Sequence, residues 1–80
     1  MCIDHMNLIE RLQSLKAPSN DLDVLCEVAL FEPDHFYASC RSNAAGTKVI
    51  YTTYTGEDHT RWAPDWTEDT VRTIELLHMK

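Results

Sequence analysis

The sequence predicts a single α+β domain over residues 1–80, with the element order α-α-β-β-α. Three segments, 5–16, 19–31 and 67–78, repeat apolar residues at the spacing of an amphipathic helix. The segment 35–55 is instead rich in aromatic and β-branched residues, which suit strands. Because 80 residues form at most one small core, we expect all of these elements to pack together.

The first helix is expected over residues 5–16. Leu8, Leu12 and Leu15 lie at i, i+4 and i+7, which places them on one face. Asp4 can cap the N-terminus of this helix. A proline that follows biases the chain toward an extended conformation and ends the helix.

A second helix is expected to begin at Ser19 or Asn20, either of which can act as N-cap. Asp21 and Asp23 then fall in the first turn, where the helix dipole favours negative charge. The helix should run to about residue 31. Its expected apolar face consists of Leu22, Leu25, Cys26, Ala29 and Leu30.

An antiparallel hairpin is expected from "HFYASC" (35–40) and "KVIYTTYT" (48–55). A hairpin of two strands is not independently stable in water. We therefore expect either a further short strand within residues 58–63 or pairing of the sheet edge with another copy of the chain. The open edge and the small core favour a homo-oligomer.

The last helix is expected to start near Thr67, whose hydroxyl can cap it. Trp66 and Val71 have the spacing of a hydrophobic staple across that cap. Glu68 and Asp69 suit the first turn. The buried stripe is expected to be Val71, Ile74 and Leu77 or His78.

The formal charge of −6 disfavours nucleic acid as a partner, because a polyanion is repelled by that field. A small anionic ligand is not excluded, since two or three local donors suffice for one phosphate. The cations are scattered rather than gathered in a stripe: Arg11, Lys16, Arg41, Lys48, Arg61, Arg72 and Lys80.

Membrane insertion and secretion are not expected. No apolar run approaches the roughly 18 residues of a membrane span, and the N-terminus lacks the pattern of a secretion signal. Cys2, Cys26 and Cys40 are an odd number of cysteines without a C-x-x-C pair, which indicates free thiols in a reducing cytosol.

No catalytic motif is present, so we expect a protein without enzyme activity and without a cofactor. Asp-His pairs occur three times, but no histidine or cysteine spacing typical of a metal site accompanies them. Turn and cap positions explain these aspartates, and we predict no metal site.

Four residues are the candidate ligand contacts: Arg61, Trp62, Arg41 and Tyr54. The cations could bind phosphate and the aromatic rings could stack on a planar ligand. The structural alternative for Trp62 is a lid over the core. The tyrosines, including Tyr37, could line a pocket or an oligomer interface, or pack in the core with their hydroxyls at the rim.

The segments "PSNDLDVLCEVAL" and "APDWTEDTVRTIELL" resemble small tailed-phage proteins of the phage ABA sandwich domain type. The matching residues are Leu22, Asp23, Pro64, Trp66, Thr67, Leu76 and Leu77. The resemblance implies a phage origin, α/β/α layering and action in the host bacterial cytoplasm. It does not imply any particular activity, because that family is largely uncharacterised.

Two functions are consistent with these observations. The first is a phage counter-defence protein that sequesters a nucleotide-derived immune signal at an oligomer interface. The alternative is an inhibitor or adaptor that binds a host protein through its acidic surface.

Overall fold

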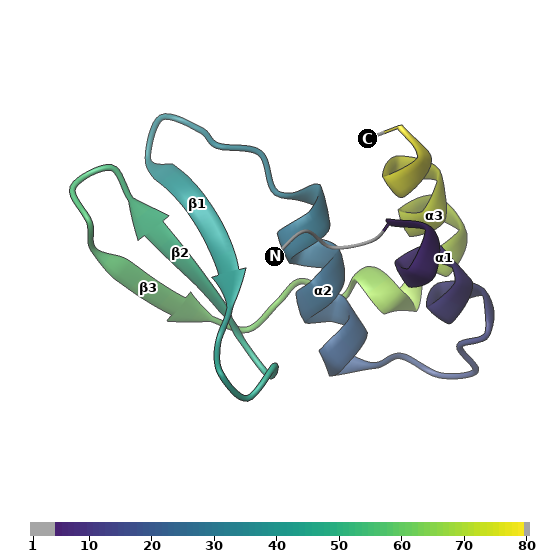
Figure 1. The fold of residues 1–80 in the computed structure, drawn as a ribbon. Helices are drawn as coiled ribbons and strands as arrows, with labels where there is room; N and C mark the ends of the chain where they lie inside the picture. The colour runs from purple at the N-terminus through teal and green to yellow at the C-terminus, as the bar shows by residue number, and fades with distance from the viewer. Residues whose placement is uncertain (1–4, 80) are drawn as a thin grey trace.

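The computed structural model describes residues 5–79 and confirms the α+β class. Helices α1 and α2 come first, strands β1, β2 and β3 follow, and α3 ends the chain after a short 3-10 helix, η1. Helix α2 lies between the sheet on one side and α1 and α3 on the other (Figure 1). The helices therefore form two layers on one side of the sheet, whereas the family resemblance implied helices on both sides.

The three helices are α1 (His5–Gln13), α2 (Asn20–Leu30) and α3 (Thr70–His78). Ser19 caps α2 as predicted, because its side chain accepts a hydrogen bond from the backbone N–H of Leu22 at 3.5 Å. Helix α1 ends three residues before the predicted boundary at residue 16. The predicted cap of α1, Asp4, lies outside the described residues.

The sheet is an antiparallel meander of β1 (Tyr37–Ser42), β2 (Val49–Thr53) and β3 (Asp58–Arg61), in the order β1-β2-β3. The third strand lies within the range where the sequence indicated one. Gly56 joins β2 to β3 with a φ of +92°, a conformation that favours glycine. Strand β2 is therefore paired on both sides, and β1 and β3 are the two edge strands of the sheet.

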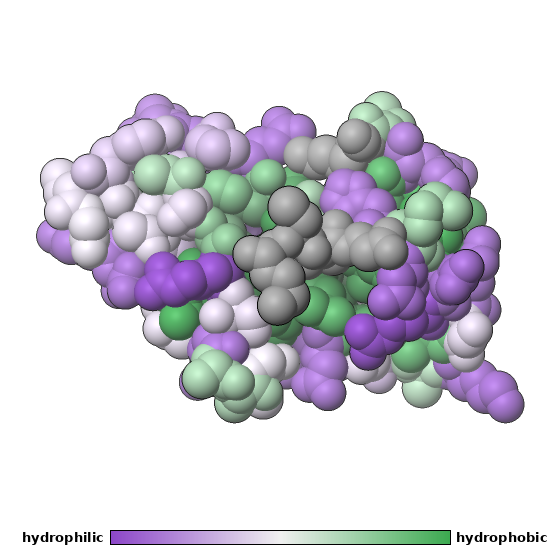
Figure 2. Space-filling view, in the orientation of Figure 1, coloured by the Kyte–Doolittle hydropathy of each residue, from purple (hydrophilic) through white to green (hydrophobic). Residues whose placement is uncertain are grey.

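The core has two parts, and α2 contributes to both. One part packs the helices together; the other packs α2 against the sheet through Val24, Val49 and Ala63. On the face shown in Figure 2, apolar side chains gather around α2, and the strands carry side chains of intermediate hydropathy. The buried residues of the first part are Leu8, Ile9, Leu12, Leu22, Cys26 and Leu77.

A buried carboxylate joins α2 to η1 (Trp66–Glu68). Asp23 is only 5% exposed, and its Oδ1 accepts hydrogen bonds from both the backbone N–H and the hydroxyl of Thr67, each at 2.7 Å. The Thr67 hydroxyl oxygen in turn accepts from the backbone N–H of Ser19 at 2.8 Å. Thr67 therefore binds the start of α2 and does not cap the last helix.

The predicted start of the last helix is wrong for this reason. The chain first makes the 3-10 turn η1, and the side chain of Asp69 then caps α3 by accepting from the backbone N–H of Arg72. The later start also changes the buried face: Thr73 and Leu77 are buried, whereas Val71 is 69% exposed. The predicted staple between Trp66 and Val71 therefore does not form.

We predict that Thr67→Val lowers the free energy of unfolding by about 1–3 kcal/mol, because the backbone N–H of Ser19 loses its acceptor and Asp23 loses a donor in a buried place. Urea denaturation measures the change. Thr60→Val, at an exposed position of β3, is the matched control and should stay within about 0.5 kcal/mol of the parent protein. Equal effects of the two substitutions would contradict the role given to Thr67.

Candidate functional site

The strand register places aromatic residues side by side on the face of the sheet that looks toward α2. Tyr51 of β2 pairs with His59 of β3, and Tyr37 of β1 pairs with Thr53 after a bulge in the ladder. The rings of Tyr37 and Tyr51 have centroids 5.0 Å apart. Phe31, which follows α2, adds a third ring 5.9 Å from that of Tyr51. Together these rings form an aromatic wall.

The aromatic wall borders a pocket of about 430 Å³ between the C-terminal end of α2 and the sheet. We call it the acidic pocket, because three carboxylates and one guanidinium line it. The three carboxylates and the guanidinium together give it a formal charge of −2 if each of these groups is ionised. Its lining residues are Glu27, Leu30, Phe31, Glu32, Asp34, Tyr37, Tyr51 and Arg61.

Glu27, one of the lining residues of this pocket, connects the helices to the sheet. Its carboxylate accepts a hydrogen bond from the hydroxyl of Tyr51 and another, at 3.0 Å, from the indole N–H of Trp66. Burial raises the pKa of Tyr51, and the hydrogen bond to Glu27 raises it further. The Tyr51 hydroxyl therefore keeps its proton near neutral pH and holds the Glu27 carboxylate in place.

Tyr37 of β1 is oriented by a residue of β3, the strand on the far side of β2. Its hydroxyl lies 3.2 Å from Nδ1 of His59, and Nε2 of His59 lies 3.6 Å from a carboxylate oxygen of Glu57. The ring of Phe36 packs edge-on against Tyr37, with centroids 4.8 Å apart. These contacts hold one ring of the aromatic wall at a defined angle to the pocket.

Asp34 holds the loop between α2 and β1. Its Oδ1 accepts hydrogen bonds from the backbone N–H groups of Tyr37, at 2.7 Å, and Phe36, at 2.8 Å. These two bonds, that of Tyr37 first, lower the pKa of Asp34 from its ordinary value of 3.8. The rim of the acidic pocket therefore carries a carboxylate that is ionised at neutral pH.

The charge and the rings of the acidic pocket suit a cation. Aromatic faces attract an ammonium or guanidinium group, and nearby carboxylates add to that attraction. A phosphate would be drawn to Arg61 but repelled by the three carboxylates of the same lining. The arrangement can thus bind a positively charged group, and binding is the chemistry that these residues provide.

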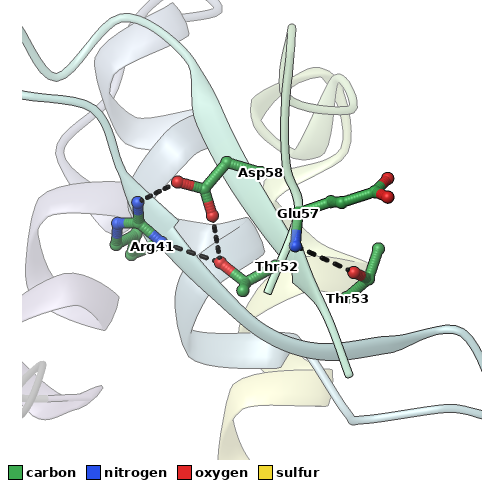
Figure 3. Close-up of polar contacts among 5 residues, drawn as sticks. All are labelled: Arg41, Thr52, Thr53, Glu57 and Asp58. Carbon is green, nitrogen blue, oxygen red and sulfur yellow. Dashed lines mark hydrogen bonds and ion pairs between the residues drawn. The ribbon is translucent and has the colours of Figure 1, made fainter. Parts of the chain in front are cut away.

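The four candidate ligand contacts from the sequence lie in different surroundings. Arg61 lines the acidic pocket. Arg41 lies on the opposite face of the sheet, where its guanidinium donates to Asp58 at 2.9 Å and to Thr52 at 2.8 Å (Figure 3). The hydrogen bond from Arg41, followed by that from Thr52, lowers the pKa of Asp58. Arg41 is therefore engaged within the sheet.

The two aromatic candidates also lie apart from each other. The hydroxyl of Tyr54, in the turn after β2, donates to the backbone carbonyl of Asp34 at 2.6 Å. Trp62 is 67% exposed, and the ammonium of Lys48 lies 4.6 Å from the centroid of its ring. Trp62 is thus not a lid over the core, and the structure brings only Arg61 of the four into the pocket.

Glu27 and Phe31 were not among the predicted site residues, and His59 entered the prediction only as part of an Asp-His pair. One signal for Glu27 was available: it follows Asp23 by four residues, so the two carboxylates share a face of α2. The placement of His59 opposite Tyr51 depends on the register of β3, and no local pattern fixes that register. Phe31 contacts Tyr51 because α2 ends at the residue before it, and the place where that helix ends sets the position of its ring.

Comparisons with protein-family models, curated proteins and solved structures find no significant match to this chain. None of the helices within residues 5–79 combines the length and the apolar character needed to cross a bilayer. The same part of the chain contains no group of three or more His, Cys, Asp or Glu side chains placed to hold a metal ion. The site must therefore be interpreted from its own geometry.

We predict that the protein loses stability in alkaline solution, because the pKa values of two cysteine thiols are raised in the folded protein. Burial, and then the charge of Asp23, raises the pKa of Cys26 from 9.0 to about 12. Burial, and then the charge of Glu27, raises the pKa of Cys40 from 9.0 to about 12. The contribution of these thiols to stability is complete below pH 9 and is lost as the pH rises toward 12, because only the unfolded chain releases the protons there.

Urea titrations below pH 9 and at steps above it measure this effect. The free energy of unfolding should fall as the pH rises above 9, and it should fall less steeply in the double variant Cys26→Ala, Cys40→Ala. Equal slopes for the parent protein and the double variant would assign the alkaline loss to other groups.

Proposed function

We propose that this chain is a small non-enzymatic binding protein that holds a cationic side chain of a partner protein in the acidic pocket. The observation that supports this function best is the meeting of the aromatic wall, formed by Phe31, Tyr37 and Tyr51, with three carboxylates in one concave site. Such a site resembles the aromatic cages that recognise positively charged groups.

The overall charge supports the same proposal. At −6, the protein attracts a basic partner from a distance, which speeds association and orients the approach. The acidic pocket then supplies a local contact for one lysine or arginine of that partner. This is the adaptor or inhibitor that the sequence allowed as its second function.

Sequestration of a nucleotide-derived signal is the second candidate, and one observation favours it. Arg61 lies in the same pocket as Tyr37 and Tyr51. Its guanidinium is suited to bind a phosphate group, and the two rings are able to stack on a nucleotide base. The carboxylates of that pocket weigh against it. The phage origin, the counter-defence role and the homo-oligomer stay predictions.

A capped tetra-arginine peptide, titrated into the ¹⁵N-labelled full chain, tests the cationic proposal. We expect shifts in the amide signals of Phe31, Tyr37 and Tyr51, and weaker binding as salt is added. Glu32→Gln should weaken binding about two- to five-fold, because it removes one rim charge. Glu10→Gln makes the same charge change on α1 and should leave the affinity nearly unchanged. Equal losses of affinity in both variants would show that the peptide responds to the net charge of the protein and not to the acidic pocket.

Arg61→Gln separates the two candidate functions. If the pocket holds a cation, removing the guanidinium should strengthen binding of the arginine peptide, because a repulsive charge is lost. If the pocket holds a nucleotide, the same variant should weaken binding of cyclic nucleotides. A thermal shift of the parent protein with a cyclic nucleotide that is lost in Arg61→Gln would favour sequestration over the proposal.

A further inference from the structure

A second concave site adjoins the acidic pocket. It has a volume of about 300 Å³ and lies between the C-terminal end of α2 and helix α3. Leu30 and Glu32 line both sites, so the two pockets are direct neighbours at this point. We call the second site the apolar pocket. Its lining residues are Leu30, Glu32, Trp66, Leu76 and Met79.

The chemistry of the apolar pocket differs from that of its neighbour. A single carboxylate, Glu32, stands at the shared border, and the other lining side chains are apolar or aromatic. Met79 is 82% exposed at the end of α3. A flexible methionine beside fixed aromatic and aliphatic groups is suited to contact with apolar side chains of varied shape.

Trp66 contacts residues of both pockets. It lines the apolar pocket, while its indole N–H donates to Glu27 of the acidic pocket. Its backbone carbonyl also accepts a hydrogen bond from the hydroxyl of Thr73 on α3, at 2.7 Å. Trp66 is therefore held by hydrogen bonds to both α2 and α3, the two helices that border the apolar pocket.

We propose that the two pockets form one groove that binds a peptide segment carrying a basic side chain and, a few residues away, a large apolar side chain. The basic side chain enters the acidic pocket and the apolar one enters the apolar pocket. Charge complementarity selects the occupant. Glu27 and Asp34 line only the acidic pocket and Glu32 stands at the border, whereas the rest of the apolar pocket carries no charged side chain. This inference rests on the proposed function and adds the identity of the second contact.

Matched peptides test the groove. Each short capped peptide carries one arginine and, after one, two or three glycines, either leucine or alanine, and each is titrated into the ¹⁵N-labelled full chain. At one spacing at least, the leucine peptide should bind about ten-fold tighter than its alanine counterpart, because the leucine side chain is removed from water. The amide signals of Leu76 and Met79 should shift with the leucine peptide alone.

Two variants, one at each end of α3, test whether the leucine side chain binds in the apolar pocket. Met79→Ser should remove most of the advantage of leucine while leaving the affinity for the alanine peptide unchanged. Val71→Ser changes another exposed apolar residue, at the start of the same helix, that lines neither pocket, and it should keep the advantage. Because both positions are exposed, neither variant is expected to unfold the protein.

The possible failures are distinguishable. If leucine and alanine peptides bind equally at every spacing, the groove is overturned and the proposed cation site stands. If no arginine peptide binds, both proposals fail. If sedimentation at the titration concentration shows a dimer that Met79→Ser dissociates, a second copy occupies the apolar pocket and the groove proposal is wrong.

Discussion

The carboxylate of Asp23, buried at the start of α2, is the constraint on which the arrangement of this molecule depends. A buried carboxylate is costly unless hydrogen bonds satisfy it, and Thr67 supplies two. Those bonds span 44 residues of sequence and fix the approach of the chain to α3. Without them, the Asp23 carboxylate would be buried without these donors, and Thr67 would be held to the start of α2 only by the bond that its hydroxyl accepts from the backbone N–H of Ser19 and by the weaker one between that hydroxyl and the Ser19 carbonyl.

The same face of α2 continues from the core to the site. Ser19, Asp23 and Glu27 are spaced by four residues, so they form one polar stripe along a helix that is otherwise apolar on two sides. The first two bind Thr67, and the third binds Trp66 and reaches Tyr51 of the sheet. One stripe therefore joins the three layers, and the acidic pocket lies where the stripe ends.

Local patterns predicted the elements but not the contacts between them. The instability of a lone hairpin indicated either a third strand or pairing with another copy, and the structure has the third strand. Local rules named Ser19 or Asn20 as the cap of α2, and the structure has Ser19. Local sequence patterns did not identify the cap of the last helix. Thr67 is a good N-cap by local rules, but a buried carboxylate distant in sequence competes for its hydroxyl.

The candidate site illustrates the same limit. Arg41 and Arg61 look equivalent in sequence, yet the register of the sheet pairs Arg41 with Asp58 on one face and places Arg61 beside the aromatic wall on the other. A one-residue bulge in β1 decides that Tyr37 meets Tyr51. Register and bulges depend on the packing of the whole sheet, so only the fold reveals which charged and aromatic side chains share a pocket.

Native-state hydrogen exchange at the backbone amide of Thr67 tests the central role of the Asp23 carboxylate most directly. If that carboxylate joins the layers, the Thr67 amide exchanges only when the whole protein unfolds, and its protection equals that of the most protected amides of α2. Exchange of the Thr67 amide at the rate of an exposed loop, while α2 stays protected, would contradict the account.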